Sequence, residues 1–208
     1  MIGAESAQNA MRLTLQARGL FGNSSHTAAN PSFARNPENN EQARHACLDA
    51  LNAWLKLFPV LQGGPEYLKA NLAIAELYSK CAMLFFREFV QAAQLETKKF
   101  EGLSFFEKKK ALWWLALKFK FYEQALTHTL LARDCKQQEG LHMLAEQSLD
   151  DRTMWAYENA HQSARALHQY SDGVIGEKAR GVIWGKNTAY KDEMHVYELK
   201  VRQMSGRG

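Results

Sequence analysis

The sequence predicts an all-α protein built from antiparallel helical hairpins in a short solenoid-like stack or bundle. Apolar residues recur at three- and four-residue spacing over most of the chain, which is the period of a helix packed along one face. The clusters that combine glycine with proline, serine or asparagine fall between these stretches and mark turns. We expect an irregular N-terminal arm over residues 1–35, a helical domain over 36–193 and a short extended tail over 194–208.

The first helix of the domain is expected to begin at Pro37, because proline suits the first helical position, and to end near Leu57. The turn at Gly63-Gly64-Pro65 separates it from a second helix over residues 66–97. The expected buried stripe of this second helix consists of Leu68, Leu72, Ala75, Tyr78, Ala82, Phe85, Phe86, Phe89 and Ala93.

A third helix is expected to start at the capping box Ser104–Glu107, in which each side chain satisfies a free backbone N–H of the other residue. It should end near Cys135. The next helical pattern covers residues 138–170, and the polar group at 148–151 leaves open whether it is one helix or two. A last helix is expected over 174–193. Apolar and charged residues then alternate at 196–202, which predicts an extended tail.

The stretch FFEKKKALWWLALKFKFYEQAL, residues 105–126, places five lysines among two tryptophans and four phenylalanines. On a helix its apolar side chains fall on two nearly opposite sides, with lysines in the seams between them. A helix on a membrane surface has one apolar face, and a nucleic-acid platform exposes its aromatic residues. We therefore expect a central core helix. One side comprises Leu112, Leu115, Phe119, Tyr122, Leu126 and Leu130, and the other Trp114, Leu117, Phe121 and Ala125.

A run of three lysines, Lys108, Lys109 and Lys110, falls in the first turn of that helix. The helix dipole disfavours each cation there by roughly a few tenths of a kcal/mol. With Lys98 and Lys99 the run forms a basic cluster between two helices. A solvated surface cluster is one interpretation, and a contact for an acidic segment of a partner is the other.

Composition and charge argue against several classes of protein. The 208 residues carry a net charge of +4, a mild balance for which we expect no nucleic-acid partner. No uncharged apolar run reaches the length of about 18 residues that a transmembrane helix needs, so no transmembrane segment is expected. The three cysteines have no metal-binding spacing, and we expect them to be small apolar residues in a reducing, intracellular compartment.

Residues 1–35 have a distinct composition. No acidic residue occurs between Ser6 and Pro37, while Arg12, Arg18 and Arg35 alternate with Ser, Thr, Ala and Gln. This is typical of an organelle transit peptide, and it is the basis for considering a mitochondrial location beside a cytoplasmic one. A flexible polar arm that lies on a partner is the alternative, and both stay open. One side of a short amphipathic helix is also compatible with the spacing of Met11, Leu15, Leu20 and Phe21.

No motif in the sequence predicts a catalytic residue or a bound cofactor. Two Glu-x-x-His pairs, Glu139/His142 and Glu158/His161, have the spacing that di-iron bundle proteins use. Those proteins place the pairs on different, facing helices and add further glutamates, whereas here the pairs lie 19 residues apart in one pattern. A helical-bundle metalloenzyme is kept as an alternative, and no residue is assigned as a metal ligand.

Three features of residues 110–201 match the pattern of a known family. In WWLALKFKFYEQALTHTLLARDCKQQEGLHMLAEQSL, an aromatic- and Ala-rich helix is followed by a KxxGxxxxxLxxA-like turn and helix. A further long helix follows, and AYKDEMHVYELKV is similar to the family's extended segment. Together they resemble the C-terminal half of the Bro domain, the helical-hairpin domain of Alix-type proteins that work with the ESCRT machinery. The chain has no counterpart of that domain's sheet-containing part. The resemblance implies a scaffold that binds helical partners in a groove, without enzymatic activity.

We expect a non-enzymatic helical scaffold, a structural or adaptor subunit of a multi-protein assembly, because helix stacks offer broad grooves and few reactive sites. The expected partners are other proteins. The arm and the tail are the expected contact elements, and the candidate contact residues are Arg12, Arg18, Lys108, Lys109 and Lys110. A Bro-like adaptor for amphipathic helices of membrane-remodelling proteins and the metalloenzyme named above are the alternatives.

Overall fold

The computed structural model describes residues 2–25, 37–62, 66–93, 100–139 and 143–204. These residues form six α-helices and one short 3-10 helix, and they include no strand. The prediction of an all-α fold is confirmed. The elements are α1 (Ile2–Ser25), α2 (Pro37–Leu61), α3 (Glu66–Ala92), η2 (Phe100–Gly102), α4 (Phe105–Glu139), α5 (Met143–Tyr170) and α6 (Glu177–Met204). Within this described part, no helix combines the length and apolar character needed to cross a membrane.

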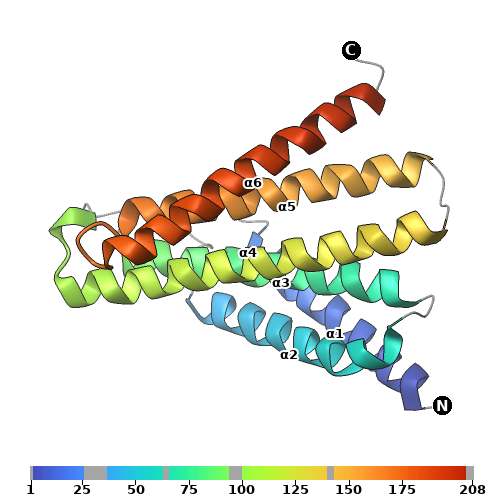
Figure 1. Ribbon diagram of the computed structural model, residues 1–208. Coiled ribbons are helices and arrows are strands. Elements are labelled where there is room, and N and C mark those ends of the chain that lie inside the picture. The colour runs from blue at the N-terminus through green and yellow to red at the C-terminus, as the bar shows by residue number, and fades with distance from the viewer. Residues whose placement is uncertain (1, 26–36, 63–65, 94–99, 140–142, 205–208) are drawn as a thin grey trace.

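Each helix packs chiefly against its neighbours in the chain, and the closest pairs are α1 with α2, α3 with α4 and α5 with α6. Figure 1 shows the resulting stack, with α1 and α2 on one side, α3 and α4 in the middle, and α5 and α6 on the other side. Short connections favour this order, because they return the chain antiparallel to the helix it has just left. The predicted stack of helical hairpins is therefore confirmed.

The helix boundaries follow local sequence signals. At the start of α4 the backbone N–H of Ser104 donates to Glu107 Oε2 at 2.8 Å, and the N–H of Glu107 donates to Ser104 Oγ at 3.3 Å. The predicted capping box is thus present. After α5, Gly173 adopts a positive φ of 67°, which favours glycine at a helix end. α5 itself is one continuous helix through residues 148–151, and Leu149 and Asp150 are buried there.

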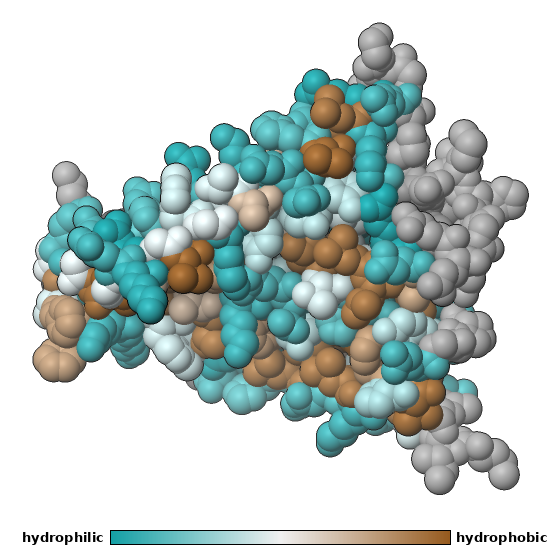
Figure 2. Space-filling model, viewed as in Figure 1, coloured by the Kyte–Doolittle hydropathy of each residue, from teal (hydrophilic) through white to brown (hydrophobic). Residues whose placement is uncertain are grey.

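Helix α4 is a core helix packed on two sides, as its sequence predicts. On the second side Trp114, Leu117 and Phe121 pack against a cluster formed by α1, α2 and α3. Figure 2 shows apolar side chains gathered where α2 meets α4. The first side faces the clusters shared with α3, α5 and α6, and its buried residues are Leu112, Leu115, Phe119, Tyr122 and Leu126.

The prediction of an irregular N-terminal arm is wrong for residues 2–25, which form α1. Helix α1 packs on α2 through residues at four- and three-residue spacing, namely Ala10, Thr14, Ala17 and Phe21. Of the stripe considered from the sequence, Met11 and Leu15 are instead exposed by 41% and 64%. Phe21 of that stripe is buried and Leu20 is half-buried, so the packed side of α1 combines small residues with only part of the large apolar stripe. Residues 26–36 lie outside the described part.

The prediction of an extended tail is also wrong, because α6 continues as a helix to Met204. Val196 and Leu199 are exposed, so the alternation at 196–202 does not mark the face of a strand. The residues that pack on α4 and α5 are Tyr190, Met194 and Tyr197, at helical spacing. The boundary predicted at residue 193 thus falls inside one helix.

Candidate functional site

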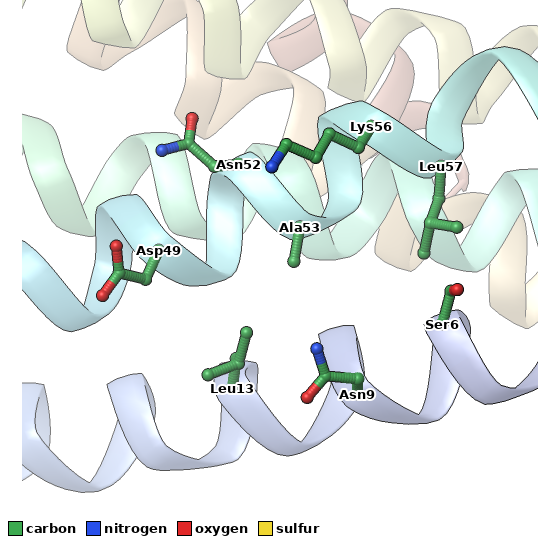
Figure 3. A pocket seen from close by; sticks show the side chains of 8 residues that line it. All are labelled: Ser6, Asn9, Leu13, Asp49, Asn52, Ala53, Lys56 and Leu57. Atoms are coloured by element: carbon green, nitrogen blue, oxygen red, sulfur yellow. The ribbon is translucent and has the colours of Figure 1, made fainter.

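A groove runs along the seam between α1 and α2, and we call it the α1–α2 groove. One part has a volume of about 430 Å³ and is shown in Figure 3. It is lined by Ser6, Asn9, Leu13, Asp49, Asn52, Ala53, Lys56 and Leu57. An adjoining part has a volume of about 740 Å³ and is lined by Gln16, Leu20, Glu41, Gln42, His45, Ala46 and Asp49. Asp49 lines both parts, so the two parts adjoin along the seam between the helices.

The groove lies beside a line of small buried side chains. Ala10 and Ala17 are completely buried on α1, and Ala43 and Ala50 are completely buried on α2. The α1 residues beside these alanines follow one helical stripe, namely Ser6, Asn9, Leu13, Gln16 and Leu20. Most of these side chains are polar and remain in water, so the edge of the seam stays open.

The groove has an apolar floor and a polar rim. In Figure 3, Leu13 points from α1 toward α2, while Ala53 and Leu57 point from α2 toward α1. The floor residues are half-buried, namely Leu13, Leu20, Ala46, Ala53 and Leu57. The rim carries side-chain amides that can donate and accept hydrogen bonds, namely Asn9, Gln16, Gln42 and Asn52. This combination suits a ligand with one apolar face and polar flanks.

The charged groups of the groove are unevenly placed. Glu41 and Asp49 line the part nearer the start of α2, while Lys56 lines the part nearer its end. Glu41 Oε1 lies 3.6 Å from His45 Nε2 and 4.0 Å from an Arg44 nitrogen. The carboxylates of the groove therefore lie toward the start and middle of α2, and its lysine lies toward the end of α2.

Two polar contacts hold α1 in register with the rest of the stack. Trp54 Nε1 of α2 donates to Thr14 Oγ1 at 2.9 Å, and both side chains are buried. Arg18 forms a two-point ion pair with Glu76 of α3, in which Arg18 Nε donates to Oε1 at 2.8 Å. Burial raises the pKa of Glu76, but the hydrogen bond from Arg18 and the charges of Arg18 and Lys80 outweigh it and leave the pKa below its usual value.

The structure does not bring the candidate contact residues from the sequence together. Arg18 is engaged with Glu76, while Arg12 donates to Asn9 Oδ1 at 3.0 Å and so lies beside the groove rim. The lysine run lies at the start of α4, at the end of the stack away from α1 (Figure 1). Lys108 and Lys109 lie over aromatic rings, 5.9 Å from that of Phe100 and 4.7 Å from that of Phe105. Lys110 is exposed, and Lys98 and Lys99 lie outside the described residues.

The Glu-x-x-His pairs give no metal site that can be described. The side chains of Glu139 and His142 lie outside the described part. Glu158 accepts a hydrogen bond from Gln162 Nε2 at 3.0 Å, and His161 Nδ1 lies 3.1 Å from the backbone oxygen of Asn187. Across the described ranges, no group of three or more His, Cys, Asp or Glu side chains is placed to hold a metal ion.

A contact between two cysteines is absent from the sequence predictions. Cys47 of α2 and Cys81 of α3 are fully buried, and their thiols share a hydrogen bond. That hydrogen bond and burial raise the pKa of the Cys81 thiol. The two residues lie at nearly equal distances along the chain from Gly63-Gly64, where the sequence predicts a turn, and this places them opposite each other in an antiparallel hairpin. This symmetry is the signal that could have revealed the pair.

A buried histidine was also not identified from the sequence. His128 of α4 lies with Nδ1 2.9 Å from Asn71 Oδ1, and its ring contacts those of Phe58 and Tyr78 at 5.1 and 5.8 Å. Burial lowers the pKa of His128 to about 4. The residue is a neutral part of the core, and no nucleophile is among the contacts it makes here.

Comparisons with known proteins leave the family of this chain open. No protein-family model matches the sequence, and no curated protein does. A solved structure titled "DHF119 filament" aligns with 98% of this chain and 87% of its own, at 12% identity and a TM-score of 0.36. Similarity at that level supports no argument about fold or function. The resemblance to the Bro domain stays a prediction.

Proposed function

We propose that this protein is a non-enzymatic helical scaffold, an adaptor or structural subunit that holds an amphipathic helix of a partner protein in the α1–α2 groove. The observation that carries this proposal is the form of the groove. It follows two helices along their length, with an apolar floor between polar rims. A helix with one apolar stripe has the complementary shape and chemistry, because its stripe covers the floor while its flanks meet the amides of the rim.

The charges of the groove favour one orientation of the bound helix. A helix carries partial positive charge at its N-terminus and partial negative charge at its C-terminus. Glu41 and Asp49 would attract the N-terminus, and Lys56 the C-terminus. We therefore propose that the partner helix runs parallel to α2. Basic residues in the first half of the partner helix and acidic residues in its last turn would strengthen the preference for this orientation.

The resemblance of residues 110–201 to the Bro domain supports the same class of function by a separate route, since it implies a scaffold that binds helical partners. It does not point to the α1–α2 groove, which lies outside those residues. A partner that docks on the α1–α2 groove therefore tests the proposal made here, independently of that resemblance.

The first experiment measures the native size of the tagged protein in a gentle lysate and identifies the proteins that co-migrate with it. Each co-migrating protein is then purified and titrated against the chain and against two variants. Ala53→Trp fills the floor of the groove. Val60→Trp places the same side chain on α2, at an exposed position that lines neither part of the groove. We expect Ala53→Trp to weaken binding at least about tenfold and Val60→Trp to leave it unchanged.

Two results would overturn the proposal. The first is a protein that migrates at its own mass of 23.7 kDa with no partner. The second is a purified partner that binds Ala53→Trp as tightly as it binds the unchanged chain. Thermal unfolding of Ala53→Trp and Val60→Trp must show that both variants are folded, so that a loss of binding reports on the groove and not on lost structure.

A further inference from the structure

A second surface of the molecule combines exposed apolar side chains with a half-buried cation, and it lies on α3, α4 and α5 rather than on α1 and α2. Lys118 of α4 lies at its centre, with Nζ 4.0 Å from the ring centroid of Phe86 on α3 and 5.9 Å from that of Tyr122. The Tyr122 ring in turn lies 6.3 Å from that of Trp155 on α5. Met83 lies one turn before Phe86. We call these five residues the Lys118 surface.

The apolar members of the Lys118 surface are exposed to an extent that is unusual for a set of neighbours. Met83, Phe86 and Trp155 are exposed by 40%, 39% and 45%, while Tyr122 below them is buried. Single exposed apolar residues are common, but a group that bridges three helices is typical of an interface. Aromatic residues and methionine are also the types that interfaces favour.

Lys118 is a cation without a counter-ion in the part of the chain that the structure describes. Its surroundings are aromatic rings, and burial lowers the pKa of its ammonium group to about 8. By contrast, Lys186 of α6 forms an ion pair of 2.6 Å with Glu123. On α5, Glu158 accepts a hydrogen bond from Gln162. A carboxylate brought by a partner would restore to Lys118 the stabilisation that it loses away from water.

We infer that the Lys118 surface binds a helical segment of another protein that presents one carboxylate to Lys118 and apolar side chains to Met83, Phe86 and Trp155. The argument for this occupant is charge complementarity at the centre of an apolar surface. A fully apolar segment would leave the ammonium group uncompensated, and a strongly acidic segment would lose its hydration against the surrounding rings. One acidic residue among apolar neighbours satisfies both conditions. The inference does not depend on the α1–α2 groove.

The test uses two displayed libraries of helical peptides, and peptides are selected from each library for binding to the full chain. The libraries are identical except that one fixes Glu and the other Gln at the central position. The positions three and four residues to either side vary among apolar residues, because these share a face with the centre. We expect the Glu library to yield binders whose Kd is at least about tenfold lower than that of the same peptides with Gln.

Three variants assign the binding to its surface. Lys118→Met should abolish the advantage of Glu over Gln, and Lys118→Gln provides the same test if the first variant does not fold. Lys120→Met changes an exposed lysine on the same helix and should leave the advantage intact. Trp155→Ala should weaken both peptides. The inference is overturned if neither library yields binders, if Glu and Gln peptides bind equally, or if Lys118→Met changes nothing.

The groove variant separates this inference from the proposed function. Ala53→Trp should leave the Glu peptides bound with unchanged affinity, since Ala53 lies on α2 in the other groove. If Ala53→Trp abolishes their binding, the peptides occupy the α1–α2 groove and the Lys118 surface is not their site. Conversely, failure of both libraries would reject the Lys118 surface and leave the groove proposal standing.

Discussion

The seams α1–α2 and α3–α4 are both formed by helices packed side by side, yet they are filled by very different side chains. Between α3 and α4, the ring of Phe85 lies 5.8 Å from that of Trp114 and 4.8 Å from that of Phe121. The Tyr78 ring lies 5.3 Å from that of Phe121. Between α1 and α2, by contrast, alanines line the centre of the contact, and a groove remains beside it.

The difference shows that side-chain size at helical spacing decides what a seam does. Large rings fill the space between α3 and α4, so this seam contributes stability through buried apolar area. Between α1 and α2, four completely buried alanines lie beside Trp54, so we expect the edge of this seam to contribute less stability and to leave an apolar floor for a ligand. The same stack thus has a closed seam at its centre and an open seam at its edge.

The largest expected effect comes from truncating one residue of each seam. Phe85→Ala should lower the free energy of unfolding by about 3–5 kcal/mol, because it removes a buried ring that contacts two others. Leu13→Ala should cost roughly 1 kcal/mol, because Leu13 lines the groove and is only half-buried. Urea unfolding of both variants measures the contrast. Equal losses would show that the α1–α2 seam is packed as tightly as the α3–α4 seam.

The next largest effect is a dependence of stability on pH that arises from His128 in the closed seam. Its folded pKa of about 4 lies below the unfolded value of 6.5, so the unfolded state binds more protons between these values. Stability should therefore be complete above pH 6.5 and fall by about 3 kcal/mol as pH drops to 4. His128→Gln should remove most of this slope, and His45→Gln, at an exposed position, should not. An unchanged slope in His128→Gln would show that other groups cause it.

A smaller effect is expected from Lys118, at the edge of the closed seam. Burial lowers its pKa from 10.5 to about 8, so the unfolded state binds more protons between these values and stability should rise with pH in that window. Buried tyrosines with raised pKa values oppose the rise above pH 10, since their stabilising effect is lost there. Lys118→Met should be more stable than the unchanged chain by about 1–2 kcal/mol at pH 7, and its stability should not rise with pH in that window. Lys120→Met is the matched control, and a less stable Lys118→Met would contradict the argument.

The smallest effect on stability is expected from the lysine run, which lies outside both seams. Replacing Lys108, Lys109 and Lys110 with glutamine should raise the free energy of unfolding by a few tenths of a kcal/mol in total, since it removes cations from a helix N-terminus. If the run contacts an acidic partner, the same variant should lose that partner at low salt. Partner retention at low salt is the measurement, and undiminished retention would reject the contact.

The comparison of seams also explains which structural predictions succeed. The two-sided burial of α4 follows from the sequence, because its large apolar residues fall on two opposite faces and leave few arrangements open. Helix α1 is missed because Ala10, Thr14 and Ala17 give little apolar signal, although their spacing is helical. The end of α6 is predicted wrongly because the alternation of apolar and charged residues at 196–202 is too short to distinguish the period of a strand from that of a helix.

The Lys118 surface and the α1–α2 groove are likewise only partly predictable from the sequence. Lys118 can be placed in a seam of α4 from the sequence, but its position over the ring of Phe86 depends on α3, which lies far away in the chain. The α1–α2 groove requires two helices to be placed side by side before its floor exists. Its lining residues are mostly small or polar, so none of them stands out in the sequence.

The sequence by itself determined the all-α class, the hairpin turns, the capping box at Ser104 and the central position of α4. These depend on local backbone chemistry and on the period of apolar residues along one helix. The tertiary structure alone decided that α1 belongs to the stack, that Cys47 meets Cys81, that Lys118 lies among aromatic rings and that a groove opens beside α1. Each of these depends on distances between helices, which side-chain sizes on both partners set together and which no single stretch of the chain contains.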